Sequence, residues 1–246
     1  MKIIGYSERG AMDALFYGMA LNNNGDSQML ELLKLANIEG SFSGFTFTIY
    51  NEFSLSEFGD PDMVIIAKKN ETDDDSVVFF VEAKVSNGSS YKINHQKKYH
   101  EEYIDNGKYV NGHASNLFFQ LRLKHYFFNT IIKSQKESIS IGESELIEKN
   151  KDRNGKNRFR TIGNNPIVKK FTEVISRCKK AYYIAIIPQQ DAAIENPKGL
   201  PESLVINYVS WEDIHKSEKL SNLLKETFDF NKDGNFSQIL NKPNNN

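Results

Sequence analysis

Three charged residues stand at the ends of two apolar runs, in an arrangement that could support chemistry. Asp62 opens the run 63–67, and Glu82 and Lys84 close the run 77–85. Residues two apart in a strand point to the same face, so we expect Glu82 and Lys84 to lie together. Removing a carboxylate and an ammonium from water is unfavourable unless they are paired or bind a metal. The pattern therefore predicts a functional site where this strand emerges.

The residue types indicate which chemistry this site could perform. Two carboxylates are hard oxygen ligands suited to Mg²⁺, which keeps several waters and is held by one or two carboxylates together with substrate phosphate. Asp62 and Glu82 are therefore candidate ligands, and Mn²⁺ is expected to substitute for Mg²⁺. The ammonium of Lys84 could orient a water and offset negative charge at phosphorus. These residues favour metal-assisted hydrolysis of a phosphodiester. The alternative is a structural ion pair between Glu82 and Lys84.

The order of these residues matches a known motif. Pro61-Asp62 followed by Glu82-Ala83-Lys84 resembles the motif of the PD-(D/E)XK superfamily, and the region from about 1 to 209 resembles a restriction-endonuclease-like nuclease. Glu-x-Lys and Pro-Asp are each common, so the match depends on the predicted strands around it. The resemblance implies an α/β fold with an αβββαβ core, in which helices flank a mixed sheet. It also implies cleavage of DNA and a third metal ligand, the backbone carbonyl of Ala83.

Two further site residues follow from the resemblance. In the family, an acidic residue on the first helix often reaches the metal, and Glu8 lies where that residue is expected. The competing account is a favourable interaction of Glu8 with the helix dipole. Gln120 corresponds to a polar residue on the helix after the lysine strand. Lys124 stands where RecB-like members have a tyrosine; it is a candidate phosphate contact, or else a lysine that faces solvent.

The remaining sequence predicts elements that position these residues. A helix capped by Ser7 carries apolar side chains at helical spacing, and three strand candidates read as an antiparallel meander. A capping box at 210–213 opens a final helical region. The other expected elements, in chain order, are helix 27–36, strands 45–53, 63–67 and 77–85, helix 114–132, and strands 181–188 and 204–209.

The domain organisation follows from this order. Residues 1–215 are expected to form the nuclease-like domain, with insertions at about 87–112 and 133–180. The sequence leaves the structure of the first insertion open. Residues 216–246 are expected to form a C-terminal helix and a tail.

Positive charge is concentrated in one segment. Residues 149–180 contain eleven Lys and Arg against two acidic residues. Clustered basic side chains can neutralise phosphates and release counterions. The alternative is a solvated loop, since charge blocks often do no more than contact water. The candidate nucleic-acid contacts are Lys124, Arg153, Lys156, Arg158 and Arg160.

Composition is compatible with one globular domain and excludes several classes. The chain has 246 residues, of which 39% are hydrophobic, and a net charge of -1. No run approaches the ~20 apolar residues of a membrane span, and the charges of the first apolar stretch argue against a signal peptide. A single cysteine, Cys178, fits a reducing compartment, so a cytoplasmic location is expected. His95 and His100 are not spaced as a zinc pair, and we expect both at the surface.

The sequence leaves three questions open. The runner-up to an active nuclease is a catalytically inactive nuclease-fold module that binds nucleic acid or a protein partner. RNA is the alternative substrate, because no module that stacks bases or recognises the 2′-hydroxyl is visible. A homodimer is an arrangement that the resemblance allows, because many members cut two strands with two copies.

Overall fold

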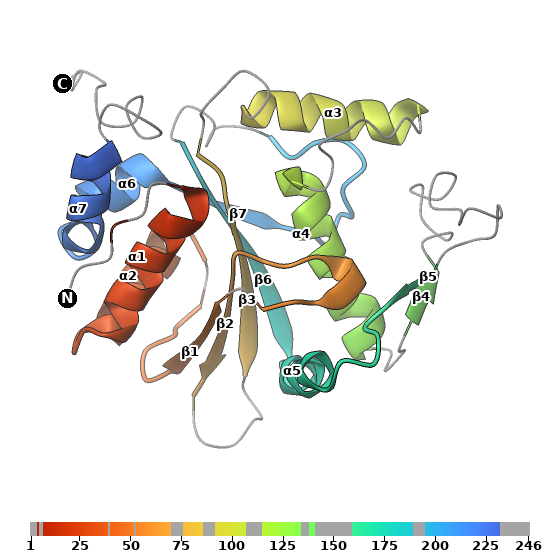
Figure 1. Cartoon of the computed structure of the whole chain (residues 1–246), viewed down its shortest axis with the longest axis horizontal. Helices are drawn as coiled ribbons and strands as arrows, with labels where there is room; N and C mark the ends of the chain where they lie inside the picture. The colour runs from red at the N-terminus through yellow and green to blue at the C-terminus, as the bar shows by residue number, and fades with distance from the viewer. Residues whose placement is uncertain are drawn as a thin grey trace.

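A computed structural model gives an α/β fold in which helices flank a five-stranded mixed sheet (Figure 1). The predicted α/β class is confirmed at this level. The structure describes residue 4 and the ranges 7–38, 40–51, 53–69, 76–85, 92–106, 115–133, 138–140, 159–188 and 195–231.

The strand order across the sheet is β1-β2-β3-β6-β7. The predicted meander is confirmed, because β1 (Thr46–Asn51), β2 (Met63–Lys68) and β3 (Val77–Ala83) pair antiparallel. Strand β6 (Lys180–Ile187) pairs parallel with β3, and β7 (Ile206–Ser210) pairs parallel with β6. The nearly continuous apolar runs of β2, β3 and β6 follow from burial on both faces.

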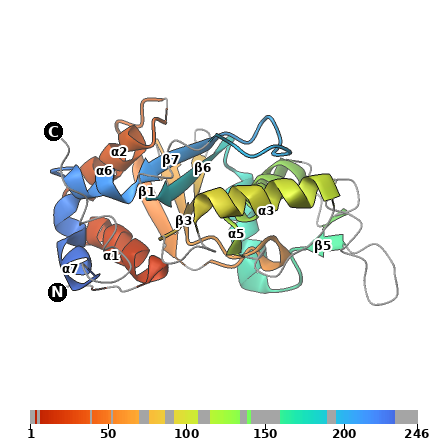
Figure 2. The ribbon, with the colours of Figure 1, turned by 90° about the horizontal axis from the view of Figure 1, so that it is seen from above.

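Within the part of the chain that the structure describes, four helices lie over one face of the sheet: α1 (Glu8–Ala20), α2 (Gly25–Leu35), α6 (Trp211–Lys216) and α7 (Ser221–Asn231) (Figure 2). The side chain of Ser7 accepts a hydrogen bond from the Gly10 N–H at 3.1 Å, which confirms the predicted cap of α1. Ser210 caps α6 in the same way. Apolar residues of these helices share one core with alternate residues of β2 and β3.

The opposite face packs against helix α4 (Leu117–Tyr126), its π-helical continuation (Phe127–Ile132) and helix α5 (Pro166–Ser176). Together, α4 and the π-helix correspond to the single predicted helix 114–132. The other residues of β2 and β3, such as Val64 and Phe80, point into this second core. A short 3₁₀ helix (Ser56–Phe58) and a two-stranded ribbon, β4 (Ser138–Ser140) with β5 (Phe159–Thr161), lie beside this layer.

The segment whose structure the sequence left open contains helix α3 (Ile93–Asn106), which packs on α4. Its buried positions are Ile93, Gln96, His100 and Tyr103, which are spaced three or four residues apart. The prediction that His100 lies at the surface is therefore wrong: it shares a helix face with apolar residues. Its ring lies 4.8 Å from that of Phe119, between centroids. His95 is exposed, as predicted.

One helix in the predicted C-terminal region and one in the predicted insertion at 133–180 also pack against the core. Helix α7 confirms the predicted C-terminal helix and packs on α1. Helix α5 lies within the predicted 133–180 insertion, and its apolar residues Val168, Phe171 and Ile175 are buried against the sheet. In the parts of the chain that the structure describes, no helix is both long and apolar enough to cross a membrane.

Candidate functional site

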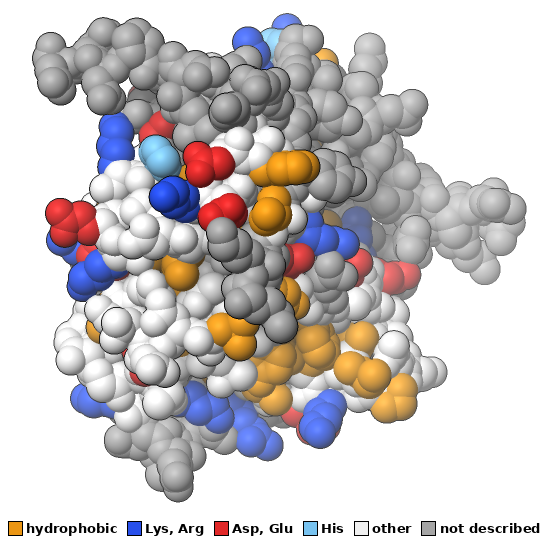
Figure 3. Space-filling view, turned by 60° about the vertical axis from the view of Figure 1, so that its left-hand side comes forward, with side chains coloured by type: hydrophobic (Ala, Val, Ile, Leu, Met, Phe, Trp, Pro, Cys, Tyr) orange, Lys and Arg blue, Asp and Glu red, His pale blue; other side chains and the backbone are white. Residues whose placement is uncertain are grey.

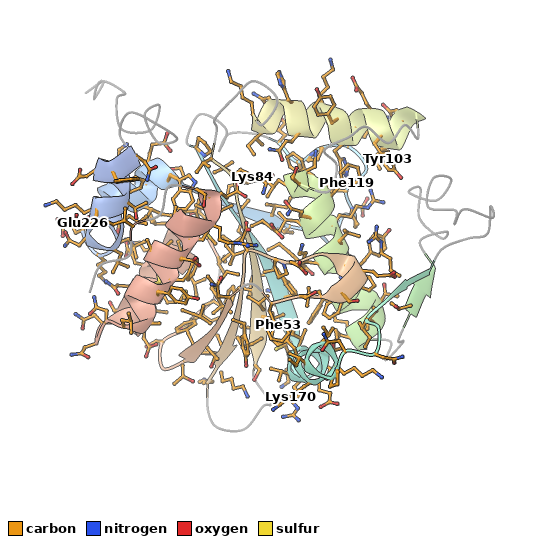
Figure 4. The ribbon with its side chains drawn as sticks, viewed as in Figure 1. Phe53, Lys84, Tyr103, Phe119, Lys170 and Glu226 are labelled. Carbon is orange, nitrogen blue, oxygen red and sulfur yellow. The ribbon has the colours of Figure 1, made fainter. Side chains whose placement is uncertain are left out.

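The predicted site residues gather at one edge of the sheet. Met63 pairs with Val81 at the last step of the β2–β3 ladder, so Asp62 and Glu82 are the next residues outward on the two strands. The parallel strands β3 and β6 end at this same edge. Figure 4 shows Lys84 at this end of the sheet, between the N-terminal end of α1 and helix α4. Ligands of open α/β sheets commonly bind outside the carboxyl ends of strands.

Asp62 connects the start of β2 to the end of β3. Its Oδ2 accepts a hydrogen bond from the backbone N–H of Ala83 at 2.8 Å. This bond continues the contact between the two strands beyond the last ladder pair. Asp62 is only partly buried, so its carboxylate lies at the boundary between the core and solvent.

Glu82 points into the protein toward α4. The Nζ of Lys124 lies 2.8 Å from its Oε1, and both side chains are 0% exposed. A lysine that faces solvent, one of the two predicted outcomes for Lys124, is therefore wrong. Gln120 lies one turn earlier on α4, on the same side of the helix as Lys124. A direct phosphate contact by Lys124 stays a prediction, and it would require the pair with Glu82 to open.

Lys84 is paired with the first helix. Its Nζ lies 3.0 Å from Oε1 of Glu8. The backbone of Lys84 is held on both sides: its N–H donates to the Ile186 carbonyl at 2.8 Å, and its carbonyl accepts from Trp211 Nε1 at 3.1 Å. The predicted alternative of a pair between Glu82 and Lys84 is wrong, because each residue is paired with a different helix.

The electrostatics reflect this crowding of charges. Burial raises the pKa of Glu82 to about 7; Asp62 acts in the same direction, while Lys124 and Lys84 oppose the rise. Burial also raises the pKa of Glu8, against the effect of Lys84. Burial lowers the pKa of Lys84, but the carboxylates of Glu8, Asp62 and Glu82 outweigh it, so the net shift is upward. Lys84 is therefore a cation at neutral pH.

The donor atoms at this edge fit a hard divalent cation in part. Both carboxylate oxygens of Glu82 and Oε1 of Gln120 are buried and have no hydrogen-bond partner among the described residues, although Oε1 of Glu82 forms the ion pair with Lys124. Over those same residues, no three His, Cys, Asp or Glu side chains converge as a metal cluster. Asp62 and Glu82 would thus supply part of a coordination shell, leaving the remainder to a backbone carbonyl, water and phosphate, as Mg²⁺ commonly requires.

Two site residues were not anticipated from the sequence. Gly59 has φ of 80°, and a Cβ added there would lie 3.3 Å from Lys124 Nζ. A glycine three residues before Asp62 could have pointed to this close approach. In the sequence, Trp211 stands out only as part of the capping box at 210–213. No feature of the sequence near Trp211 indicates its hydrogen bond to Lys84.

Only some of the candidate nucleic-acid contacts lie among the described residues. Arg153, Lys156 and Arg158 lie outside the described residues. Arg160, on β5, donates to the backbone carbonyl of Glu57, and the Glu57 carboxylate accepts from the Thr161 N–H at 2.7 Å. These bonds attach β5 to the loop that leads to Asp62. On the face in Figure 3, Lys and Arg are interspersed with Asp and Glu.

Comparisons of this chain with protein-family models, with curated proteins and with solved structures found no match. The PD-(D/E)XK resemblance therefore stays a prediction based on the motif. Any assignment of function depends on the geometry of the site itself.

Proposed function

We propose that this protein is a metal-dependent nuclease of the PD-(D/E)XK type that hydrolyses phosphodiester bonds in DNA. The observation that carries the proposal is the convergence of Asp62, Glu82 and Lys84 at one sheet edge, with Glu8 bound to the lysine. Coincidental spacing in the sequence would not require residues from separate elements to meet.

The order of elements supports the same proposal. Helix α1 precedes three antiparallel strands, helix α4 follows them, and β6 then returns parallel to β3. This order is compatible with the αβββαβ core that the resemblance implies, if α2, α3, the β4–β5 ribbon and α5 are counted as additions to it. Fold alone does not imply function, so the charged residues at the strand ends remain the decisive feature.

The residues divide into two roles in the proposed reaction. Asp62, Glu82 and the backbone carbonyl of Ala83 would hold Mg²⁺, which when bound would polarise a phosphoryl oxygen and activate water. Lys84, a cation held by Glu8, would orient the attacking water and offset charge that builds on phosphorus. Water adds to phosphorus as the bond to the leaving oxygen breaks, so the products are a phosphomonoester and an alcohol.

One observation favours the alternative, a nuclease-like module that binds nucleic acid or a protein without cutting. Both site lysines already have a carboxylate partner inside the protein. A site whose charges are fully compensated can be purely structural. The unpartnered Oε2 of Glu82 favours the active enzyme over this alternative.

Cleavage of supercoiled and linear plasmid with Mg²⁺, Mn²⁺ or EDTA tests the proposal. We expect metal-dependent cutting by the wild type and its loss in Asp62→Ala and Lys84→Ala. Asp60→Ala is the matched control, since Asp60 is an exposed aspartate two residues away. A folded wild type that leaves plasmid, single-stranded DNA and RNA intact, yet binds DNA, would favour the binding module. Cutting of RNA alone would change the substrate and keep the chemistry.

A further inference from the structure

Lys124 carries a charge into the interior of the protein. Its side chain and that of its partner Glu82 are both 0% exposed. Lysines are almost never fully buried unless they are paired. A buried ion pair is nevertheless weak evidence for stability, because apolar residues of similar volume often serve as well or better. The pair is therefore better explained by a role in the site than by a contribution to stability.

The ammonium of Lys124 also lies against the loop that leads to Asp62. A Cβ on Gly59 would be 3.3 Å from Nζ, so the lysine packs closely against the backbone here. The Gly59 N–H donates to the carbonyl of Ser56 at 3.2 Å, which closes the turn. Lys124 thus lies between the strand end that carries Glu82 and the loop that carries Asp62.

The carboxylate of Glu82 is engaged on one side only. Oε1 forms an ion pair with Lys124 Nζ at 2.8 Å. Among the described residues neither carboxylate oxygen has a hydrogen-bond partner, so Oε2, which is also buried, is the oxygen that no cation contacts. Partners that hold a ligating carboxylate typically orient it, and their loss weakens metal binding about 10- to 100-fold.

We propose that Lys124 is a positioning residue for the carboxylates at this edge: it fixes Glu82 through Oε1, leaves Oε2 for a divalent cation, and supports the loop of Asp62. This inference depends on the proposed function, because it assumes that Asp62 and Glu82 bind a metal. It assigns Lys124 to the protein interior, in place of the phosphate contact expected from the sequence.

Binding of Mn²⁺ to the purified protein, followed by the EPR signal of the free ion, tests the proposal without a substrate. We expect Lys124→Met to raise the Kd for Mn²⁺ by about tenfold. Lys98→Met is the matched control, since this exposed lysine pairs with Glu102 on α3 and should leave the Kd unchanged. Lys124→Gln, which keeps a hydrogen-bond donor, replaces the methionine variant if that variant does not fold, with the Kd expected to rise.

Cleavage assays add a second readout. In Lys124→Met, the Mg²⁺ concentration for half-maximal cutting should rise by a similar factor, with a smaller change in the rate at saturating Mg²⁺. A folded variant that binds Mn²⁺ as tightly as the wild type, or more tightly, would overturn the role of Lys124 and leave the nuclease proposal standing. A wild type that binds no Mn²⁺ and shows no metal-dependent cutting would overturn both.

Discussion

Among the described residues, two lysine–glutamate pairs lie at the same end of the sheet but differ in their access to water. In the pair of Lys84 with Glu8 the side chains are 7% and 30% exposed, and in the pair of Lys124 with Glu82 both are 0% exposed. The first pair joins the end of β3 to α1, and the second joins β3 to α4 on the opposite face. The chemistry of the two pairs is the same, so burial is what separates them.

This difference indicates how similar ion pairs can serve different purposes. A pair that is open on one side can exchange its partner for a substrate phosphate or a water, because solvent stabilises the separated charges. A fully enclosed pair is held together by the strong attraction of charges in a medium of low dielectric constant. We therefore assign Lys84 to the reaction and Lys124 to the support of Glu82.

The largest expected effect is on DNA cleavage when Lys84 is removed from the more exposed pair, that of Lys84 with Glu8. Lys84→Ala should lower kcat by about 10³-fold, within the range for loss of a group that assists proton transfer. Single-turnover cleavage of labelled DNA at saturating Mg²⁺ measures this change. Lys92→Ala, at an exposed lysine eight residues later, is the control and should cut normally. A loss of less than tenfold in a folded Lys84→Ala protein would exclude Lys84 from the reaction.

For the free energy of unfolding the order should be reversed, so that the buried pair contributes more than the exposed pair. Lys124→Met leaves Glu82 buried without its partner and should cost roughly 3–5 kcal/mol of unfolding free energy. Glu8→Gln removes a more accessible carboxylate and should cost about 1 kcal/mol. Urea denaturation in the absence of metal measures both, and the double variant Glu82→Gln/Lys124→Met should recover much of the first loss. Equal losses from the two single variants would contradict the comparison.

The stability of the metal-free protein should depend on pH through Glu82. Its pKa of about 7 lies above the ordinary value of 4.5, so the folded state binds this proton more tightly than the unfolded state. The resulting stability is fully present below about pH 4.5 and is lost as the pH rises through 7, a total change on the order of 3 kcal/mol.

Urea denaturation from pH 5 to pH 8 with EDTA measures this dependence. The double variant Glu82→Gln/Lys124→Met is the reference, and it should show a smaller fall over the same range. Glu8 keeps its raised pKa in that variant and contributes in the same direction. Identical pH profiles for the two proteins would show that Glu82 titrates in the folded state as it does in the unfolded chain.

The smallest expected effect concerns the hydrogen bond that holds the backbone carbonyl of Lys84. Trp211→Phe removes the hydrogen bond to the Lys84 carbonyl and should cost about 1 kcal/mol of stability, with a modest fall in the cleavage rate. Thermal unfolding and the single-turnover assay measure the two changes. Tyr126→Phe, at a partly buried aromatic residue on α4, is a control for the assay. Full activity with unchanged stability would remove Trp211 from the site.

Much of the fold follows from local patterns. Ser7 and the apolar spacing after it predict α1, and the runs that form β2, β3 and β6 predict buried strands. The candidate site was predictable to the same extent, because Asp62, Glu82 and Lys84 stand at strand ends. The burial of His100 could not be inferred in that way, since the structure of its segment was left open and its neighbours on the helix face were unknown.

The sequence alone determined the strands, the caps and the charged residues at the ends of β2 and β3, because these depend on side-chain alternation and on neighbours along the chain. The partners of those charges depend instead on how the helices pack against the sheet. Glu82 meets Lys124 and Lys84 meets Glu8, across separations of 42 and 76 residues along the chain. The reason is physical: the docking of α1 and α4 on opposite faces selects which charges share a buried space, and no local pattern contains that information.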